Sequence, residues 1–410
     1  MSDYVPKYQG EYVGRGKYVA NEEICDILAR VVQCDSTFGR EGDCGRLIES
    51  IAKEYGLHAE IMPCGQDDRF NVIITEGAES YKGETLGLML HGHYDTVPVL
   101  DMPEPFHTKI QDNKMWGRGI VDQKGGVVAS LCALIAIKRS GKKLKKPVCL
   151  AAVIDEESEH RGSYTLTKSG IKAEYALTTE PTDTVTCEFG CKGTTPIRII
   201  VEGKTAHASN PWVGVNAIEK SLPILHGLFA MQFPQVDLGE FGVKQGTICV
   251  SKMDAGTAYN NVPGEAVIWM DRRTVPGENT PLALEQVKAV VEEAKKQDPA
   301  IVATVEVARP DWHWAPIRER GLNPTWMKDD CELYDYLNQA ARKSGLQDLK
   351  KCYSNGYNDM DFLINDLGIP TLVYGPGDGR MAHTPYEEVD IDDVCKVTEV
   401  YCNLIKELCM

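Results

Sequence analysis

The chain has 410 residues, a formal net charge of −16, 43% hydrophobic residues and 25% charged residues. This length favours two domains, and the composition is ordinary for a soluble globular protein. The acidic charge argues against nucleic acid or an anionic membrane as a partner, although it identifies no substrate.

Helices and strands alternate in the first part of the chain. Amphipathic patterns predict helices at 21–32 and 44–55, the second ended by Gly56. The longest apolar stretch, from Val127, predicts a buried helix that ends near Gly141 and is too short to span a bilayer. Short apolar runs bounded by turn residues predict buried strands at LGLML, CLAAVI and EYALTT.

The pattern changes after Cys187 and returns near Arg309. Between these residues lie runs typical of three strands and two helices: TPIRIIVEG, GTICVSKMDAG, EAVIWMDRRT, VGVNAIEKSLPILHGLF and TPLALEQVKAVVEEAKKQ. Beyond them come the helix CELYDYLNQAARKSG, the strand IPTLVYG and the helix DDVCKVTEVYCNLIKEL. A compact α+β unit at 188–309 therefore interrupts a larger α/β domain formed by 1–187 and 310–410.

The fourteen cysteines are scattered and form no CxxC pair. Cys187 and Cys191 are the closest two, and we interpret them as free thiols because no second Cys/His pair completes a zinc motif. The N-terminal segment MSDYVPKYQGEY has no secretory signal, so we expect a cytoplasmic protein. Several thiols lie in apolar helices or strands, as buried cytosolic thiols do: Cys132, Cys149, Cys249 and Cys402.

Clusters of histidine and acidic residues follow four of the predicted strands. They are His93 with Asp95, the triplet 155–157, Glu180 and His383. In an open α/β sheet, ligands bind in the crevice outside the carboxyl ends of the strands. We therefore expect these side chains to meet at one edge of one sheet. Histidine together with carboxylates is typical of a transition-metal site, with zinc as the first choice.

Individual positions suggest different tasks. His93 and Asp95 are two apart and face the same side of a strand end, where Asp95 can hold the second ring nitrogen of His93. His91 shares their parity, but a lone histidine is usually structural and we leave it out of the site. Asp122 lies in the glycine-rich turn GRGIVDQKGG, where its carboxylate can bridge two cations or simply cap the next helix.

The neighbours Glu156 and Glu157 point in different directions at a strand end. One of them can bind metal while the other takes a proton from water. The alternative is an ordinary acidic loop without a role, which is how we interpret the nearby Glu159. Glu180 and His383 can supply one further ligand each.

A set of motifs between about Leu86 and Val389 resembles a known family. HGHYDTVP, GRGIVDQKGG, DEE, TTEPT, GKTAHAS, DRRTVPG and GPGDGRMAHTPYE occur in this order. They are similar to the co-catalytic zinc hydrolases that include acetylornithine deacetylase, succinyl-diaminopimelate desuccinylase, aminoacylase, glutamate carboxypeptidase and cytosolic dipeptidases. The resemblance implies an α/β fold with a mixed central sheet flanked by helices, and an inserted α+β ferredoxin-like dimerisation or lid domain. It therefore also implies a homodimer.

The resemblance further implies two Zn²⁺ ions per chain, for which Co²⁺ or Mn²⁺ can substitute. Glu156 would be the general base, and Asp95 would orient a ligating histidine. The implied ligands are His93, Asp122 and Glu180 for one ion, and Asp122, Glu157 and His383 for the other.

Substrate contacts are implied within the inserted domain. His207 would reach the active site of the partner subunit and stabilise the oxyanion, although without the resemblance it would be an ordinary loop histidine. Arg273 would grip a substrate carboxylate, for which a guanidinium fork is suited. Asn261 and Lys192 would also contact substrate, and the segment 356–359 is a further candidate for the pocket.

Two features depart from the family pattern or add to it. The glycines usual after the Glu-Glu pair are replaced by SEHRG, which puts the local shape in question and places His160 close to the expected metals. The aromatic cluster PDWHWAP, with Trp312 and Trp314, can either pack in the core or shape a pocket for a hydrophobic group.

Together these residues predict a metal-dependent amidohydrolase that acts on N-acyl amino acids or small peptides with a free carboxylate. A metal-bound hydroxide would attack, with Glu156 as its base. A dipeptidase or aminopeptidase with the same metals is an alternative, but it needs an acidic group near the substrate amine that the sequence does not single out. A catalytically silent scaffold homologue is a second alternative, which the complete ligand set and Glu156 oppose.

Overall fold

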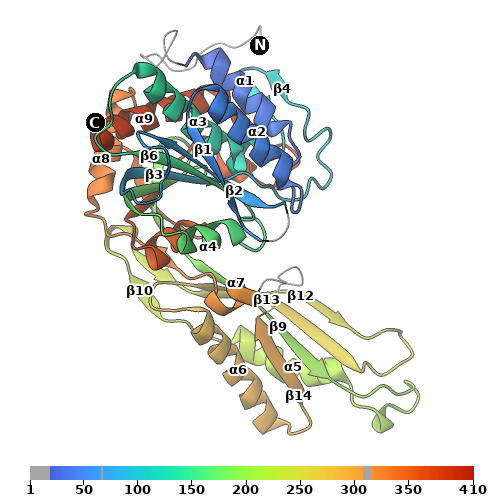
Figure 1. Ribbon diagram of the computed structural model, residues 1–410. Coiled ribbons are helices and arrows are strands. Elements are labelled where there is room, and N and C mark those ends of the chain that lie inside the picture. Colours follow the sequence, from blue (N-terminus) through green and yellow to red (C-terminus); the bar gives the residue numbers. More distant parts are fainter. Residues whose placement is uncertain (1–18, 66–67, 308–314) are drawn as a thin grey trace. The chain divides into compact units, whose positions relative to one another are not determined.

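The computed structural model of the protein describes residues 19–65, 68–307 and 315–410, and in it the chain forms two compact units (Figure 1). Unit 1 comprises the described residues up to Gly190, then Trp326–Ser354 and Asn358–Met410. Unit 2 comprises the described part of Cys191–Thr325, with Asn355–Tyr357. The chain thus enters unit 2 three residues after the predicted boundary at 187. It returns to unit 1 at Trp326 rather than at the predicted 310, which lies outside the described residues.

Unit 1 is built on a mixed sheet whose middle strands β6, β3, β7 and β17 run parallel, while β1, β2 and β8 pair antiparallel. Every residue of β3 and β6 is buried, as their uninterrupted apolar sequences predict. In sheet order the strands are β1 (His58–Pro63), β2 (Phe70–Glu76), β6 (Val148–Val153), β3 (Leu86–His93), β7 (Ala173–Thr178), β17 (Thr371–Val373), β8 (Thr186–Cys191) and β15 (Thr325–Trp326), with β16 (Lys350–Ser354) beside β8.

Helices flank this sheet, which confirms the predicted fold class (Figure 1). Unit 1 also contains a separate three-stranded sheet in the order β18-β5-β4. The elements are α1 (Asn21–Val32), α2 (Glu41–Glu54), α3 (Gly125–Ser140), α4 (Arg161–Lys168), α7 (Ala315–Arg320), α8 (Glu332–Lys343), α9 (Ile391–Cys409), β4 (Lys109–Gln111), β5 (Lys114–Trp116) and β18 (Glu388–Asp390).

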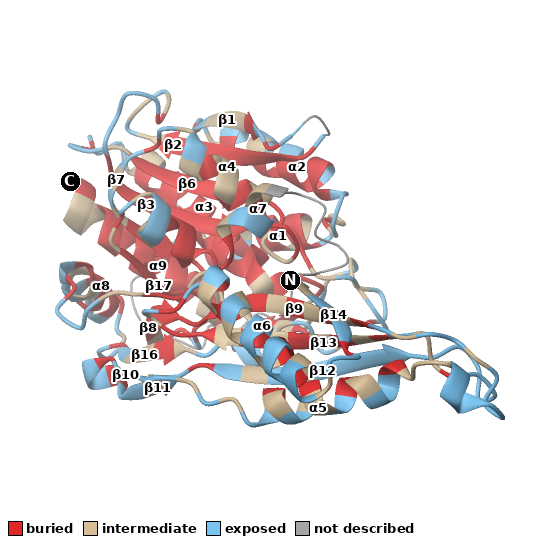
Figure 2. Ribbon diagram, turned by 90° about the horizontal axis from the view of Figure 1, so that it is seen from below, coloured by how far each residue is buried: buried red, intermediate tan, exposed pale blue. Residues whose placement is uncertain are grey.

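The central helix of unit 1 is longer than predicted. A π-helical turn at Ile120–Lys124 continues into α3, so Ile120–Ser140 is long and apolar enough to cross a membrane by length and composition. However, 94% of its most apolar window is buried inside the protein, and α3 appears in the red interior in Figure 2. The expectation of a buried core helix is therefore confirmed, although the expected short length was wrong.

Unit 2 has the ferredoxin-like arrangement predicted for the insertion. Its elements follow the order β-α-β-β-α-β, and its sheet has the antiparallel order β12-β13-β9-β14. Buried residues alternate along β9 and β13, because only one face of the sheet packs against the two helices. The elements are β9 (Gly193–Glu202), α5 (Ala217–Phe229), β12 (Thr247–Ala255), β13 (Glu265–Thr274), α6 (Thr280–Gln297) and β14 (Val302–Val307), with a separate hairpin of β10 (Gln235–Asp237) and β11 (Val243–Gln245).

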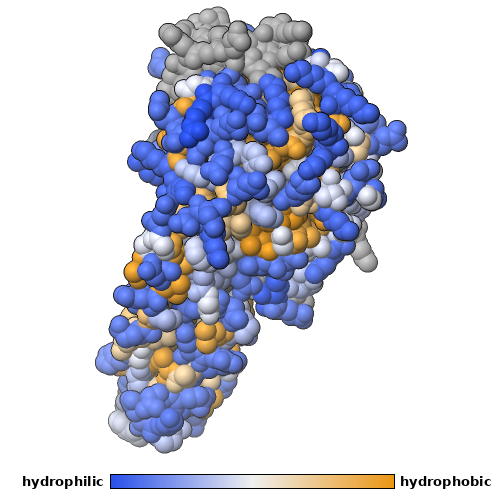
Figure 3. All heavy atoms as spheres, turned by 90° about the vertical axis from the view of Figure 1, so that its left-hand side faces the viewer, coloured by the Kyte–Doolittle hydropathy of each residue, from blue (hydrophilic) through white to orange (hydrophobic). Residues whose placement is uncertain are grey.

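The hydrophilic surface and most of the cysteines are as the sequence predicts. Hydrophilic side chains predominate on the face drawn in Figure 3, as a net charge of −16 leads one to expect. All fourteen cysteines are free, including the buried pair Cys187 and Cys191. Cys249 is exposed, contrary to prediction, because β12 is an edge strand of its sheet.

Candidate metal centre

The predicted ligands meet at the carboxyl edge of the parallel strands. His93 closes β3, Glu156 and Glu157 follow β6, and Glu180 follows β7. His383 comes from the loop after β17, at a left-handed backbone position with φ 62°. Neighbouring parallel strands end on the same side of the sheet, so residues far apart in sequence come together here as predicted.

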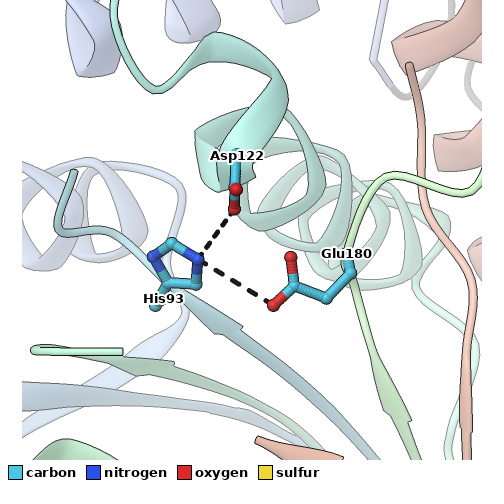
Figure 4. Close-up of side chains that lie close together, drawn as sticks. All are labelled: His93, Asp122 and Glu180. Carbon is cyan, nitrogen blue, oxygen red and sulfur yellow. Dashed lines mark hydrogen bonds and ion pairs between the residues drawn. The ribbon is translucent and has the colours of Figure 1, made fainter. Parts of the chain in front are cut away.

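His93 is the centre of the first group of possible ligands, which Figure 4 shows. Its Nε2 lies 3.0 Å from Oδ1 of Asp122 and 3.9 Å from Oε1 of Glu180. On the other side of the ring, Nδ1 lies 3.1 Å from the backbone oxygen of Asp95 and 3.4 Å from its carboxylate. Asp95 thus contacts Nδ1 of His93 while Nε2 of the same ring faces Asp122 and Glu180, as the sequence predicted.

Asp122 also belongs to a second group. Its Oδ2 lies 3.2 Å from Nε2 of His383, and that same nitrogen is 3.0 Å from Oε1 of Glu157. The possible ligand atoms of each group lie within 4.8 Å of one another. Because the two oxygens of Asp122 face different histidines, this carboxylate has the geometry of a bridge between two cations.

Electrostatics indicates that the site is built for positive charge. Burial raises the pKa of Glu157 to about 6, and burial followed by the charge of Asp122 holds the pKa of Glu180 well above its usual range. Hydrogen bonds to Asp122 and Glu157 raise the pKa of His383 to about 10. Buried acids that repel one another in this way are stabilised when divalent cations bind between them. Imidazole and carboxylate donors fit zinc, so the residues suit the predicted metal.

Glu156 lies beside these groups and differs from them. Burial, and then the charge of Asp359, raises its pKa well above the usual range. Within the described parts of the chain, its carboxylate has no hydrogen bond or ion pair. Its backbone N–H donates to Oδ1 of Asp95 at 3.2 Å, and that of Glu157 donates to Oδ2 at 3.1 Å. Asp95 therefore positions both the first histidine and the loop that carries the two glutamates.

Glu387 holds the loop of Asp122 as Asp95 holds the loop of the two glutamates. Sequence reasoning missed this residue. It is 1% exposed and accepts hydrogen bonds from Nη1 of Arg118 at 2.8 Å and from the backbone of Gly119, Val121 and Asp122 at 2.9, 3.0 and 3.3 Å. The available signal was its place as the last residue of the motif GPGDGRMAHTPYE. A buried acid that ends a motif without being a ligand is a candidate for this holding role.

In unit 2, His207 and Asn261 form an isolated antiparallel β-bridge, although they are far apart in sequence. The backbone N–H of Ser209 donates to Nδ1 of His207 at 3.1 Å, and the Ser209 hydroxyl lies 2.7 Å from the same nitrogen. An N–H can only donate, so the neutral ring carries its proton on Nε2. His207 is exposed and can therefore present Nε2–H as a donor.

Lys192 and Arg273 lie in a positively charged part of unit 2. Lys192 is only 8% exposed, and burial, followed by the charges of Lys244, Arg273 and Arg272, lowers its pKa. Among the described residues no carboxylate pairs with Lys192. Arg273 donates through Nε to Oδ2 of Asp271 at 2.9 Å. A buried lysine that faces only like charges is a candidate for binding an anion.

His91, Trp312 and Trp314 were considered in the sequence analysis but not assigned to the metal site. His91 is buried, and its Nε2 lies 2.9 Å from the Ser163 hydroxyl, away from both ligand groups. Trp312 and Trp314 lie outside the described residues, so the question of packing or pocket stays open for them.

Comparison with known proteins gives concordant results. The sequence profile of peptidase family M20/M25/M40 matches residues 89–407. The chain is 24% identical over 400 residues to the [LysW]-lysine/[LysW]-ornithine hydrolase of Sulfurisphaera tokodaii, covering 96% of this chain and 98% of the relative. It is 26% identical over 347 residues to the acetylornithine deacetylase of Myxococcus xanthus, covering 83% and 85%.

Solved structures share the fold. A tripeptidase from Staphylococcus aureus superposes with a TM-score of 0.77 at 22% identity, covering 95% of this chain and 99% of the other. A metallo-carboxypeptidase of the M20 family from Sulfolobus solfataricus superposes with a TM-score of 0.76 at 18% identity, covering 94% and 98%.

Proposed function

The chain belongs to peptidase family M20/M25/M40, and from this premise we propose that it hydrolyses the amide bond of N-acyl amino acids or small peptides that bear a free carboxylate. The observation that carries the proposal is the pair of ligand groups that share Asp122. A shared carboxylate suits two divalent cations about 3.5–4 Å apart, the arrangement of co-catalytic hydrolytic sites. Two Zn²⁺ ions, or Co²⁺ or Mn²⁺ in their place, are the expected cofactors.

Bound cations would polarise the scissile carbonyl and lower the pKa of water. We assign the proton transfers to Glu156, which takes a proton from the attacking water and delivers it to the leaving amine. Two observations support this role. The Glu156 carboxylate has no hydrogen-bond partner among the described residues, and the Asp95 carboxylate fixes its backbone. Glu156 therefore occupies a defined place while its side chain stays available.

The substrate carboxylate would bind to the cationic groups of unit 2. Lys192 and Arg273 support this assignment because the burial of Lys192 beside other positive charges is unfavourable until an anion arrives. Arg273 offers the planar fork that matches a carboxylate. Asn261, beside His207 in the bridge, would add a polar contact to the substrate.

We further propose a cytoplasmic homodimer in which His207 of one copy donates a hydrogen bond to the oxyanion at the partner's site. The Nε2–H tautomer set by Ser209 supports the donor role. An exposed edge strand, β12, and the exposed apolar residues Leu222 and Phe229 on α5 offer a surface for pairing between two copies. Fourteen free thiols support a reducing compartment.

The alternative is a peptidase that uses the same metals but requires a free amine on its substrate. The similar fold of the tripeptidase from Staphylococcus aureus is the observation that favours it. One screen separates the two. Purified protein loaded with zinc, manganese or cobalt is assayed on N-acyl amino acids and on dipeptides, each with a free carboxylate. We expect hydrolysis of at least one class in a metal-dependent manner. Absence of any amide hydrolysis with all three metals would contradict the proposal.

A further inference from the structure

Two cysteines of unit 1, Cys34 and Cys44, lie against each other where α1 is joined to α2. Cys34 follows the end of α1, and Cys44 lies near the start of α2. The sulfur of Cys44 lies 3.9 Å from the backbone oxygen of Val31, and the backbone N–H of Cys34 donates to the same oxygen at 3.3 Å. A hydrogen bond joins the two cysteine side chains. Since sulfur is the only polar atom in either side chain, this bond runs from one thiol to the other, although both cysteines are free.

The two thiols differ in their access to solvent. Cys44 is fully buried, whereas Cys34 is only partly buried. A small reagent from solution therefore meets the Cys34 sulfur first. Cysteines that react reversibly with oxidants are typically accessible thiols that lie next to a second, resolving thiol. The position of Cys34 fits the first role, and that of Cys44 fits the second.

A buried cation lies beside Cys34. The Lys124 side chain is fully buried, and its ammonium donates to the backbone oxygen of Cys34 at 2.8 Å. In the described part of the chain, no carboxylate forms an ion pair with Lys124. A negative charge nearby stabilises such an ammonium, and a cation next to a cysteine favours its thiolate. The Asp43 and Asp35 carboxylates oppose the thiolate, but they act more weakly than Lys124.

These contacts give the two thiols opposite acidities. The hydrogen bond from Cys44, together with the charge of Lys124, lowers the pKa of Cys34 to about 7 against the effect of burial. The hydrogen bond to Cys34 and burial hold the pKa of Cys44 well above its usual range. Burial also raises the pKa of Cys25 and Cys64 to about 11. At neutral pH roughly half of Cys34 is therefore the nucleophilic thiolate, while Cys44 keeps its proton.

We propose that Cys34 and Cys44 form a redox modification site, at which hydrogen peroxide oxidises the two thiols to a reversible disulfide. The Cys34 thiolate attacks one oxygen of the peroxide, the O–O bond breaks, and a sulfenic acid forms while hydroxide leaves and takes up a proton from solvent. The Cys44 sulfur then attacks the Cys34 sulfur and displaces the sulfenic hydroxyl, which leaves as water with the Cys44 proton. The two thiols lose two electrons in total, and the peroxide gains them.

The disulfide requires only local movement. The two sulfurs must approach to about 2.05 Å, the length of a disulfide bond. Cys34 lies in the connection between two helices rather than within one of them, so this approach breaks no helical hydrogen bond. Reducing dithiols attack an accessible disulfide sulfur and restore both thiols. The modification is thus reversible in a compartment that keeps thiols reduced.

Peptide mapping tests the site on the whole protein. The reduced protein is treated with an equimolar amount of hydrogen peroxide at neutral pH, remaining thiols are blocked with iodoacetamide, and the digest is analysed by mass spectrometry. We expect a pair of peptides linked through Cys34 and Cys44, which dithiothreitol separates. The exposed Cys249 should stay largely reduced, because it lies opposite Asp271 on β13 and a neighbouring carboxylate disfavours a thiolate.

Two serine variants separate the roles of the thiols, and Cys249→Ser is their matched control. In Cys44→Ser the hydroxyl can still donate a hydrogen bond, so Cys34 should react but stop at a sulfenic acid, which dimedone traps. In Cys34→Ser, Cys44 should stay reduced. Cys249→Ser should form the same disulfide as the wild type.

The wild-type map decides by itself if a variant does not fold. The site is overturned if peroxide oxidises Cys249 while it leaves Cys34 and Cys44 reduced. It is also overturned if Cys34 of the wild type is driven to a sulfinic acid or links to another cysteine, because Cys44 then does not resolve the product. The test requires no hydrolytic activity, so its outcome is independent of the proposed function.

Discussion

The two units of the chain differ in the charge of the groups they supply. Unit 1 brings acids and histidines to one sheet edge, where burial and mutual repulsion raise the pKa values of Glu157 and Glu180. Unit 2 places Lys192 near other cations, which lowers its pKa. The acids at this edge of unit 1 are therefore suited to a cation, and Lys192 of unit 2 is suited to an anion. This difference supports our proposal that unit 1 carries the metal chemistry and that Lys192 and Arg273 of unit 2 recognise the substrate's negative charge.

The units also differ in how their functional residues are held. In unit 1 the buried acids Asp95 and Glu387, which are not ligands, fix the backbone of two ligand-bearing loops. In unit 2, His207 is exposed and is oriented by its near neighbour Ser209. Metal sites and general bases require rigid positioning, which the hydrogen bonds of Asp95 and Glu387 give to unit 1. Substitutions in unit 1 should therefore change metal binding and turnover. Those in unit 2 should leave metal binding unchanged and alter kcat through His207 or KM through Lys192 and Arg273.

The largest expected effect separates the base from the ligands within unit 1. Glu156→Gln should lower kcat by about 10²–10⁴-fold, because proton transfer is lost. Its content of the two tightly bound ions should be unchanged at low zinc. His383→Ala should instead lose metal first. Turnover is measured together with metal content, and near wild-type activity of Glu156→Gln would refute the assignment of the base.

The next effect tests whether unit 2 acts in trans. His207→Ala should lower kcat by about 10²–10³-fold, the range typical for loss of one oxyanion donor. Mixing it with Glu156→Ala creates dimers in which one site has both wild-type groups, so activity should return in part. If mixtures that demonstrably exchange subunits stay as inactive as their parents, His207 does not act on the partner's site.

A smaller effect tests the holding role of Glu387. Glu387→Gln should weaken zinc binding by about 10–100-fold, because the hydrogen-bond network that orients Asp122 loses its charge. Glu388→Gln is the matched control, since the carboxylate of Glu388, next to Glu387 in sequence, pairs among the described residues only with Lys114. Competition with a zinc chelator measures the affinity. Equal affinities of the two variants would show that Glu387 does not position the metal ligands.

The cationic groups of unit 2 should affect KM rather than metal content. Lys192→Met and Arg273→Met should each raise KM by about 10–100-fold, since a charged hydrogen bond contributes about 1.5–3 kcal/mol. Lys296→Met removes an exposed lysine of α6 that is paired with Glu293, so it should leave KM unchanged. Steady-state kinetics is compared for a substrate and its C-terminal amide. An equal rise in KM for both would mean that the substrate carboxylate is not the group recognised.

The smallest effect concerns the pH dependence of unit 1. Burial lowers the pKa of His91 from 6.5 to about 4, and its side chain is 1% exposed. The unfolded chain therefore takes up a proton below pH 6.5 that the folded protein does not, so stability falls as pH falls towards 4. Between pH 6.5 and 5 the loss should be about 1.5 kcal/mol.

Urea unfolding of the wild type and His91→Gln at both pH values measures this contribution. The variant should lose less stability than the wild type on acidification, because it has no imidazole to titrate. An equal loss in both proteins would show that His91 is not held neutral by burial.

The sequence by itself determined most of the local structure and the set of candidate metal ligands. Helices α1 and α6 and strand β13 have the predicted bounds, because amphipathic period and capping residues are local signals. The histidines and acids could be placed at one edge because each follows an apolar run that forms a parallel strand. The exposure of Cys249 was missed, since local sequence does not reveal which strand lies at an edge.

The tertiary structure alone decided how these groups contact one another. The division of the Asp122 oxygens between two histidines depends on loops that meet only in the folded chain. The bond between His160 and Asp359 joins residues 199 positions apart, and that between Arg118 and Glu387 joins residues 269 apart. Such contacts carry no local signature, because hydrogen-bond geometry is fixed by the packing of elements that are distant in sequence. The sequence therefore specifies which possible ligands exist, and the fold specifies which of them lie close enough to bind one cation.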